Sequence, residues 1–169
     1  MRAVDIVEER RLGESPIDYV QRLAEDKAFA VLLHSGEVIL GADTTVVIDD
    51  HVLEKPRDMA DAGRMLGLLA GREHQVITGI CLRSESQKIV DVATTRVRFV
   101  TLTHEELEAY AASGEPIDKA GAYAIQGLAS KFIDRIEGEY FNVVGLPVAL
   151  VYRHWKEISD GMAGEHLIK

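Results

Sequence analysis

The sequence predicts an α/β or α+β fold with a mixed sheet, and three observations support this prediction. Segments with helical spacing of apolar residues alternate along the chain with apolar runs rich in Val and Ile. Hydrophobic residues make up 47% of the sequence and charged residues 28%, close to the globular average, which excludes a disordered or fibrous chain. The length of 169 residues suits one domain with a sizeable core, and no internal repeat or Pro/Gly-rich linker divides it.

Helices are predicted where capping residues precede amphipathic segments. Ser15 is a suitable N-cap, and Pro16 fits the first helical position after it. Asp58 is expected to cap a second helix, and Thr103 with Glu106 forms a capping box for a third. The predicted helices span residues 15–34, 59–70, 103–114 and 147–158. We expect residues 159–169, which have two glycines and little periodicity, to form a flexible tail.

Strands are predicted in the apolar runs between these helices. The expected strands span residues 38–48, 52–53, 76–82, 90–100 and 132–136, and the first is interrupted by Gly41-Ala-Asp-Thr44. In the fourth, polar residues at 94, 96 and 98 alternate with 95, 97 and 99, which is typical of a strand with one wet face. Cys81 lies in an apolar run and is expected to be a buried core residue; as the single cysteine it excludes an internal disulfide and a Cys-rich metal site.

The charge balance excludes some classes of partner. The net charge is −9 and the pI near 5.1, so the surface repels phosphate backbones and anionic lipid. No apolar stretch approaches the ~18 residues that a membrane span needs, and the N-terminal residues lack the apolar region of a signal peptide. We therefore expect a cytoplasmic protein that binds neither nucleic acid nor membranes. The acidic surface does not exclude a small anionic ligand held in a local basic pocket.

Three stretches have a residue composition that packing alone does not explain. Asp43 stands beside a glycine between apolar strand segments, and is either a metal ligand or general base, or a turn aspartate that binds its own backbone. Lys55 and Arg57 precede a predicted helix N-terminus and either grip phosphates or form a solvated loop. The segment 113–127 is long and rich in glycine, and is either functional or a plain surface connection.

Several common site patterns are absent from the sequence. It contains no G-x-S-x-G, Walker A or G-x-G-x-x-G motif, and its histidines show no metal-ligand spacing. The adjacent Arg10 and Arg11 are better explained as a solvated pair within a run of charges than as a phosphate grip.

Taken together, the unusual stretches resemble the Maf family (septum-formation-inhibitor proteins), which are nucleoside triphosphate pyrophosphatases. The resemblance covers residues 5–155. Its Glu54-Lys-Pro-Arg57 and Asp118-Lys-Ala-Gly-Ala-Tyr123 motifs look like the branch acting on dTTP and UTP rather than the branch favouring 7-methyl-GTP. The matching segments are residues 14–28, Gly41-Ala-Asp-Thr44, Glu54-Lys-Pro-Arg-Asp58, Ser113-Gly-Glu-Pro116, residues 118–127 and Asn142-Val-Val-Gly-Leu-Pro147.

The resemblance implies a fold, a reaction and a set of site residues. The implied fold is a single domain over residues 1–169, with a mixed curved sheet, flanking helices and two lobes around a cleft, similar to inosine triphosphate pyrophosphatases. The implied reaction converts dTTP, UTP or modified pyrimidine triphosphates to the monophosphate and pyrophosphate with a divalent cation, Mg²⁺ or Mn²⁺. Asp43 matches the catalytic acidic residue and would share the metal with Glu8. Lys27 and Lys55 would neutralise phosphate charge, and Gln126 would contact the base or position the water.

The sequence departs from the family pattern at its start. The family opens with a strand, a Ser-x-Ser-x-Arg-Arg segment that supplies hydroxyl and arginine groups to the phosphates, and a helix. Nothing precedes Met1, so we expect either a truncated reading of a longer gene or an altered family member. The chain is then an active pyrophosphatase or, alternatively, a catalytically impaired nucleotide-binding or regulatory protein linked to cell division and septum formation. A sheet edge left open by the absent strand leads us to expect a homodimer.

Overall fold

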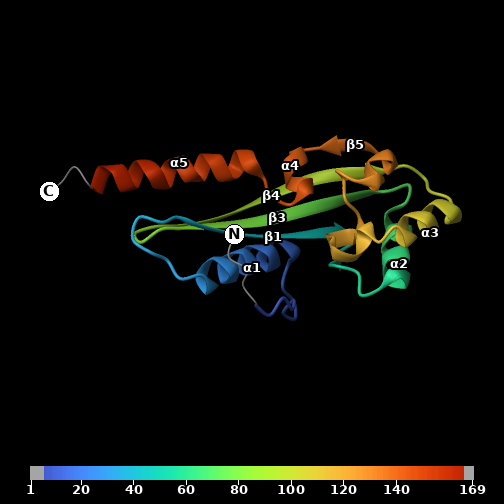
Figure 1. Cartoon of the computed structure of the whole chain (residues 1–169), viewed down its shortest axis with the longest axis horizontal. Coiled ribbons are helices and arrows are strands. Elements are labelled where there is room, and N and C mark those ends of the chain that lie inside the picture. Colours follow the sequence, from blue (N-terminus) through green and yellow to red (C-terminus); the bar gives the residue numbers. More distant parts are fainter. Residues whose placement is uncertain (1–5, 166–169) are drawn as a thin grey trace.

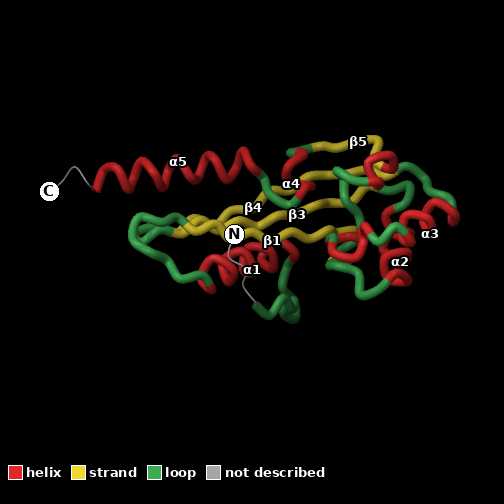
Figure 2. The backbone as a smooth tube through the Cα atoms, in the orientation of Figure 1, coloured by secondary structure: helices red, strands yellow, loops and turns green. Residues whose placement is uncertain are grey.

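The computed structural model describes residues 6–165, with side chains as far as residue 160, and consists of a long sheet flanked by helices (Figures 1 and 2). The strands are β1 (Ile39–Ile48), β2 (His51–Leu53), β3 (Glu73–Arg83), β4 (Lys88–Phe99) and β5 (Ile133–Glu137). The α-helices are α1 (Pro16–Ala30), α2 (Met59–Leu69), α3 (His104–Ala112), α4 (Tyr140–Val144) and α5 (Val148–Glu165). Three 3₁₀ turns lie between α3 and β5, over Glu115–Asp118, Ala120–Ala122 and Leu128–Phe132.

The sheet has the strand order β2-β1-β3-β4-β5. The predicted α/β class, with a sheet flanked by helices, is confirmed. The four described junctions are all antiparallel, however, whereas the sequence predicted a mixed sheet. The short turn that joins β3 to β4 explains part of this difference, because tight turns join antiparallel strands and a parallel pair needs a long crossover.

The strand β1 runs without a break through the segment around Asp43. It pairs with β3 continuously from Ile39 to Val47, so the glycine and carboxylate that looked like an interruption lie within one strand. After β1, Asp49 and Asp50 both have positive φ (46° and 63°), which suits a two-residue hairpin turn into β2. β2 covers β1 only from Val46 onward; among the described residues, the earlier part of β1 has a strand partner on one side alone.

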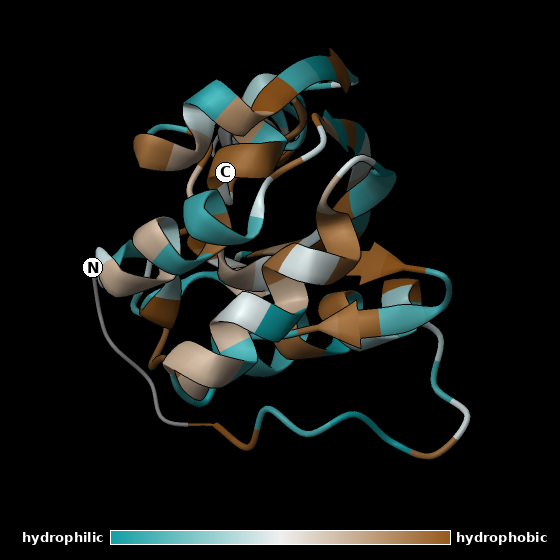
Figure 3. Cartoon of the chain, turned by 90° about the vertical axis from the view of Figure 1, so that its right-hand side faces the viewer, coloured by the Kyte–Doolittle hydropathy of each residue, from teal (hydrophilic) through white to brown (hydrophobic). Residues whose placement is uncertain are grey.

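Helices α1 and α5 cover opposite faces of the long strands. On one face, the backbone of α1 approaches so closely that a Cβ on Gly79 would lie 2.4 Å from the Val20 carbonyl oxygen. On the other face, Leu150 and Ile158 of α5 pack against Ile80 and Leu82. Hydrophilic and hydrophobic residues alternate along the helices in Figure 3, as expected for elements with one buried face.

The largest apolar core lies at the other end of the strands, under α2, α3 and the 3₁₀ turns (Figure 1). Phe99 and Phe132 are among its fully buried side chains, and the expected N-caps Asp58 and Thr103 begin α2 and α3. α1 and α5 thus lie toward one end of the sheet and α2 and α3 at the other (Figure 1), in agreement with the two lobes that the family resemblance implies. Within the described residues, no helix has the length and apolar character needed to cross a membrane.

The last helix ends later than predicted. α5 continues from Val148 to Glu165, past the end near residue 158 that the sequence suggested. Ile158 is fully buried, and no proline follows it, so an established helix can add further hydrogen-bonded residues. Residues 159–165 of the expected tail are thus helical, and the remainder of that tail lies outside the described residues.

Candidate active site

A cavity of about 370 Å³ lies beside β1, and its other walls come from α1, the connection between β2 and α2, the 3₁₀ turns and the end of α4. Most of its charged groups come from segments that the sequence singled out. The carboxylates that line it belong to Glu8, Asp43, Glu54 and Asp118, and the ammonium groups to Lys27, Lys55 and Lys119. A volume of this size falls in the range of small-molecule sites, and charges of both signs suit an anionic ligand held with a cation.

Lys27 joins two carboxylates at one end of this cavity. Its Nζ lies 2.5 Å from Oδ1 of Asp43 and 2.7 Å from Oε1 of Glu8. Asp43 comes from the middle of β1, Lys27 from the last turn of α1 and Glu8 from the segment before that helix. The structure thus brings together three of the five site residues predicted from the sequence.

The placement of Lys27 follows from local packing. Leu23 and Ala24, four and three residues earlier, are both buried against the sheet, so the helix presents Lys27 to the same side. Gly41 allows this approach, since a Cβ there would lie 2.1 Å from the Ala24 carbonyl oxygen. Asp43 stands two residues further along β1, and therefore on the same strand face as Gly41.

The environment shifts the pKa of both members of the ion pair. Burial raises the pKa of Asp43 above its usual range, although the hydrogen bond and charge of Lys27 oppose this, and the charge of Glu8 adds to the rise. Burial would lower the pKa of Lys27, but its hydrogen bonds to Asp43 and Glu8 outweigh that effect and the pKa is raised. Lys27 therefore stays charged, while Asp43 accepts a proton more readily than an exposed aspartate.

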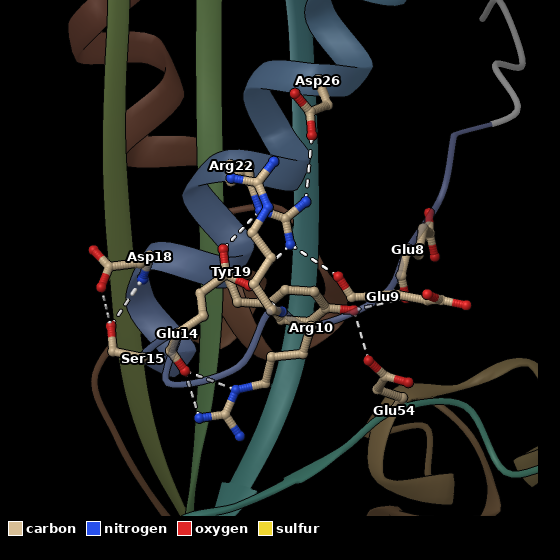
Figure 4. A network of polar contacts seen from close by, with 11 residues as sticks. Glu8, Glu9, Arg10, Glu14, Ser15, Asp18, Tyr19, Arg22, Asp26 and Glu54 are labelled. Atoms are coloured by element: carbon tan, nitrogen blue, oxygen red, sulfur yellow. Dashed lines mark hydrogen bonds and ion pairs between the residues drawn. The ribbon is translucent and has the colours of Figure 1, made fainter.

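A second polar contact at this cavity involves residues that the sequence analysis did not select. The Tyr19 hydroxyl lies 2.6 Å from Oε1 of Glu54 and 3.0 Å from the Glu8 carbonyl oxygen (Figure 4). Tyr19 lies within the matching segment 14–28, but nothing in the sequence marked it individually. Glu54 stood in the Glu54-Lys-Pro-Arg motif, which was the available signal for it.

The remaining predicted residues divide into two groups. Lys55 lines the cavity, as do Lys119 and Tyr123 from the 113–127 segment. Gln126 is exposed and does not line it. Arg57 is 84% exposed at its side chain and pairs with Asp61, so the solvated-loop interpretation applies to this residue.

Val143, Val144 and Gly145, at the end of α4, also form part of the cavity wall. The preceding residue, Asn142, is fully buried, and its Nδ2 donates at 3.0 Å to both the Val76 carbonyl and Oγ1 of Thr95. This gives the Asn142-Val-Val-Gly-Leu-Pro147 segment a structural role, because one amide ties the wall to both β3 and β4.

The donor set at the cavity fits a magnesium-type cation that is partly held by its substrate. Within residues 6–165 as described, no group of three or more His, Cys, Asp or Glu side chains is arranged to hold a metal. Glu8 and Asp43 nevertheless converge, since both contact the same Nζ. Mg²⁺ is commonly bound through one or two carboxylates together with substrate phosphates, which is the arrangement that these two residues offer.

Comparison with known proteins found a matching family model and several similar proteins. The family model described as "Maf-like protein" matches residues 1–158. A dTTP/UTP pyrophosphatase of Koribacter versatilis is 54% identical over 142 residues, covering 83% of this chain and 74% of the relative. A dTTP/UTP pyrophosphatase of Vibrio cholerae is 52% identical, covering 85% and 78%, and one of Bacillus pumilus is 46% identical, covering 90% and 82%.

Proposed function

Because this chain belongs to the Maf-like protein family, we propose that it hydrolyses dTTP and UTP to the monophosphate and pyrophosphate. The relatives above carry the name dTTP/UTP pyrophosphatase. The observation that carries the proposal is the contact of Lys27 with Asp43 and Glu8 in the wall of the cavity. A buried carboxylate with a raised pKa, beside fixed positive charge, suits the activation of water next to a triphosphate.

The proposed reaction is attack by water on the α-phosphorus. The water oxygen bonds to this phosphorus while the bond from phosphorus to the oxygen that bridges to the β-phosphate breaks. Asp43 takes the proton from the water, and pyrophosphate leaves with the electron pair of the broken bond. Lys27 stays charged and, with Lys55, offsets the negative charge that develops on the phosphate oxygens.

We propose that Glu8 and Asp43 hold a divalent cation, Mg²⁺ or Mn²⁺. When bound, such a cation neutralises charge on the phosphates and on the leaving pyrophosphate. The contact of both carboxylates with Lys27 supports this, since a cation near the triphosphate would share the same two groups. The proposed role of Gln126, at the base or at the water, rests on the family resemblance alone.

Pyrophosphate release from dTTP and UTP, with either metal and with EDTA, tests the proposed function. We expect turnover that depends on added metal and disappears with the chelator. Folded protein that releases no pyrophosphate from either nucleotide would contradict the proposal. If such protein still bound dTTP, the regulatory alternative would be favoured.

We further propose a cytoplasmic homodimer without a nucleic-acid partner. The net charge of −9 supports a small anionic substrate over a nucleic acid. Residues 39–45 of β1 have a described strand partner on one side only, and an open edge of this kind favours pairing with a second chain. Light scattering after size exclusion tests the dimer, and a monomer at high concentration would refute it.

A further inference from the structure

Tyr19 presents its hydroxyl to the cavity from a rigid support. The residue is 2% exposed, and its ring packs in one cluster with Leu23 and Ile77. The helix that carries it cannot slide freely, because the backbone of α1 is seated directly on Gly79. The hydroxyl is therefore a fixed point in the wall of the cavity.

This fixed hydroxyl faces two segments that lie outside helices and strands. The Glu8 carbonyl, at 3.0 Å, belongs to the segment before α1, and the Glu54 carboxylate, at 2.6 Å, belongs to the connection between β2 and α2 (Figure 4). A phenol has one hydrogen to donate, and the shorter contact goes to the charged acceptor, which forms the stronger hydrogen bond. Both segments supply groups to the proposed site: the first carries Glu8, and the second carries Lys55, which directly follows Glu54.

The hydroxyl acts as a donor rather than as an acid or base. Burial, together with the hydrogen bond to Glu54 and its charge, raises the pKa of Tyr19 well above its ordinary value. The phenol therefore keeps its proton throughout the neutral range. This restricts Tyr19 to holding other groups in place.

We propose that Tyr19 and Glu54 are positioning residues: the hydrogen bond from the Tyr19 hydroxyl holds the Glu54 carboxylate, and with it the backbone that carries Lys55, beside the reacting phosphates. This inference rests on the proposed function. Glu54 is fixed from two directions, since its backbone carbonyl also accepts a hydrogen bond of 3.2 Å from the Gly121 amide. Glu54, in the connection that also carries Lys55, thus contacts both α1 and the 3₁₀ turn Ala120–Ala122.

Steady-state kinetics of Tyr19→Phe with dTTP test the inference. We expect kcat/KM to fall about tenfold, the effect of losing one hydrogen bond to a charged group, while the pH profile keeps its shape. Glu54→Ala should lose about as much, and Glu54→Gln, which keeps an acceptor oxygen, should recover part of the loss. The double variant Tyr19→Phe/Glu54→Ala should be no worse than either single variant, because both remove the same contact.

Thr103→Ala provides a matched control for lost stability. It removes the capping box of α3, which does not line the cavity, and should lower the melting temperature by about 3 °C with kcat/KM unchanged. If Tyr19→Phe behaves like this control, or if the two single effects add in the double variant, the positioning role is refuted.

Binding of α,β-methylene-dTTP, measured by calorimetry, separates this inference from the proposed function. Protein that binds the analogue without turning over dTTP would overturn the hydrolytic function alone. A weaker Kd for Tyr19→Phe than for Thr103→Ala would then still support the positioning pair, and equal Kd values would overturn it. Protein that neither binds the analogue nor hydrolyses dTTP overturns both proposals.

Discussion

Nε2 of His74 lies 2.9 Å from the hydroxyl of Tyr123, and this contact joins the apolar core to the wall of the cavity. His74 is 2% exposed and stands edge-on to the rings of Tyr123 and Phe99. Burial lowers the pKa of His74 to about 4, so the imidazole is neutral in the folded protein at pH 7.

The lowered pKa of His74 predicts a loss of stability in mild acid. Below an unfolded-state pKa of about 6.5, the unfolded chain takes up a proton that the folded chain rejects until about pH 4. The stability that depends on a neutral His74 is therefore fully present above pH 6.5 and is lost as the pH falls toward 4. Between pH 7 and pH 5 we expect the free energy of unfolding of the wild type to fall about 2 kcal/mol more than that of His74→Gln. Urea unfolding at both pH values measures this, and parallel pH dependences would contradict it.

Replacing Asp43 by asparagine should remove the proposed base while keeping the shape of the side chain. We expect kcat to fall by about 100-fold or more, the usual contribution of a general base. Asp134→Asn is the matched control, because this aspartate pairs with Arg98 at the surface of β5, away from the cavity. Pyrophosphate release measures both variants, and activity in Asp43→Asn near that of the control would remove Asp43 from its proposed role.

Lys27→Gln should change the pH dependence of activity as well as its magnitude. The charge of Lys27 holds down the pKa of Asp43, so its removal should raise that pKa further. The acidic limb of the kcat/KM profile should accordingly move to higher pH, with kcat/KM at least about tenfold lower at its maximum. Lys88→Gln, which removes a surface ion pair with Glu25, is expected to leave the profile in place. An unshifted acidic limb in Lys27→Gln would show that Asp43 does not control it.

Adding a methyl group at Gly79 should push α1 away from the sheet. The new Cβ would meet the Val20 backbone at 2.4 Å, and neither backbone can yield without moving the helix. We expect Gly79→Ala to cost about 3 kcal/mol of stability, and to lower activity because α1 carries Lys27. Gly67→Ala lies in α2 with no atom within 4 Å of its Cβ, so it should stabilise the protein by about 0.5 to 1 kcal/mol. Urea unfolding of the two variants compares them directly, and equal stabilities would refute the close approach.

The local features of the fold were predictable because they depend on neighbours in sequence. Ser15, Asp58 and Thr103 each cap a helix as expected, since a cap needs only the next three residues. The alternation of exposed Arg96 and Arg98 with buried residues of β4 is likewise local and is confirmed. The run of β1 through Gly41 was missed, because it depends on pairing with β3 about 40 residues later.

The candidate site was predictable where residue type and motif agreed. Asp43, Lys27 and Glu8, which the family resemblance indicated, meet in the structure. The contact between Tyr19 and Glu54 spans 35 residues and joins a helix to a loop, so no periodicity in the sequence could reveal it. Their pairing depends on how closely α1 approaches the sheet, which is a property of the assembled fold.

The buried amide of Asn142 has a consequence for how the protein opens. Its side-chain amide donates hydrogen bonds to β3 and β4, and its backbone carbonyl accepts one from Oγ1 of Thr78 in β3. Buried contacts therefore join α4 to these two strands. Freeing Asn142 together with the segment that follows it would break three buried hydrogen bonds and leave the Asn142 amide without these partners inside the protein. Amide hydrogens there should consequently exchange with deuterium only when the central strands themselves come apart, so that the rim beside the proposed substrate is as long-lived as the middle of the sheet.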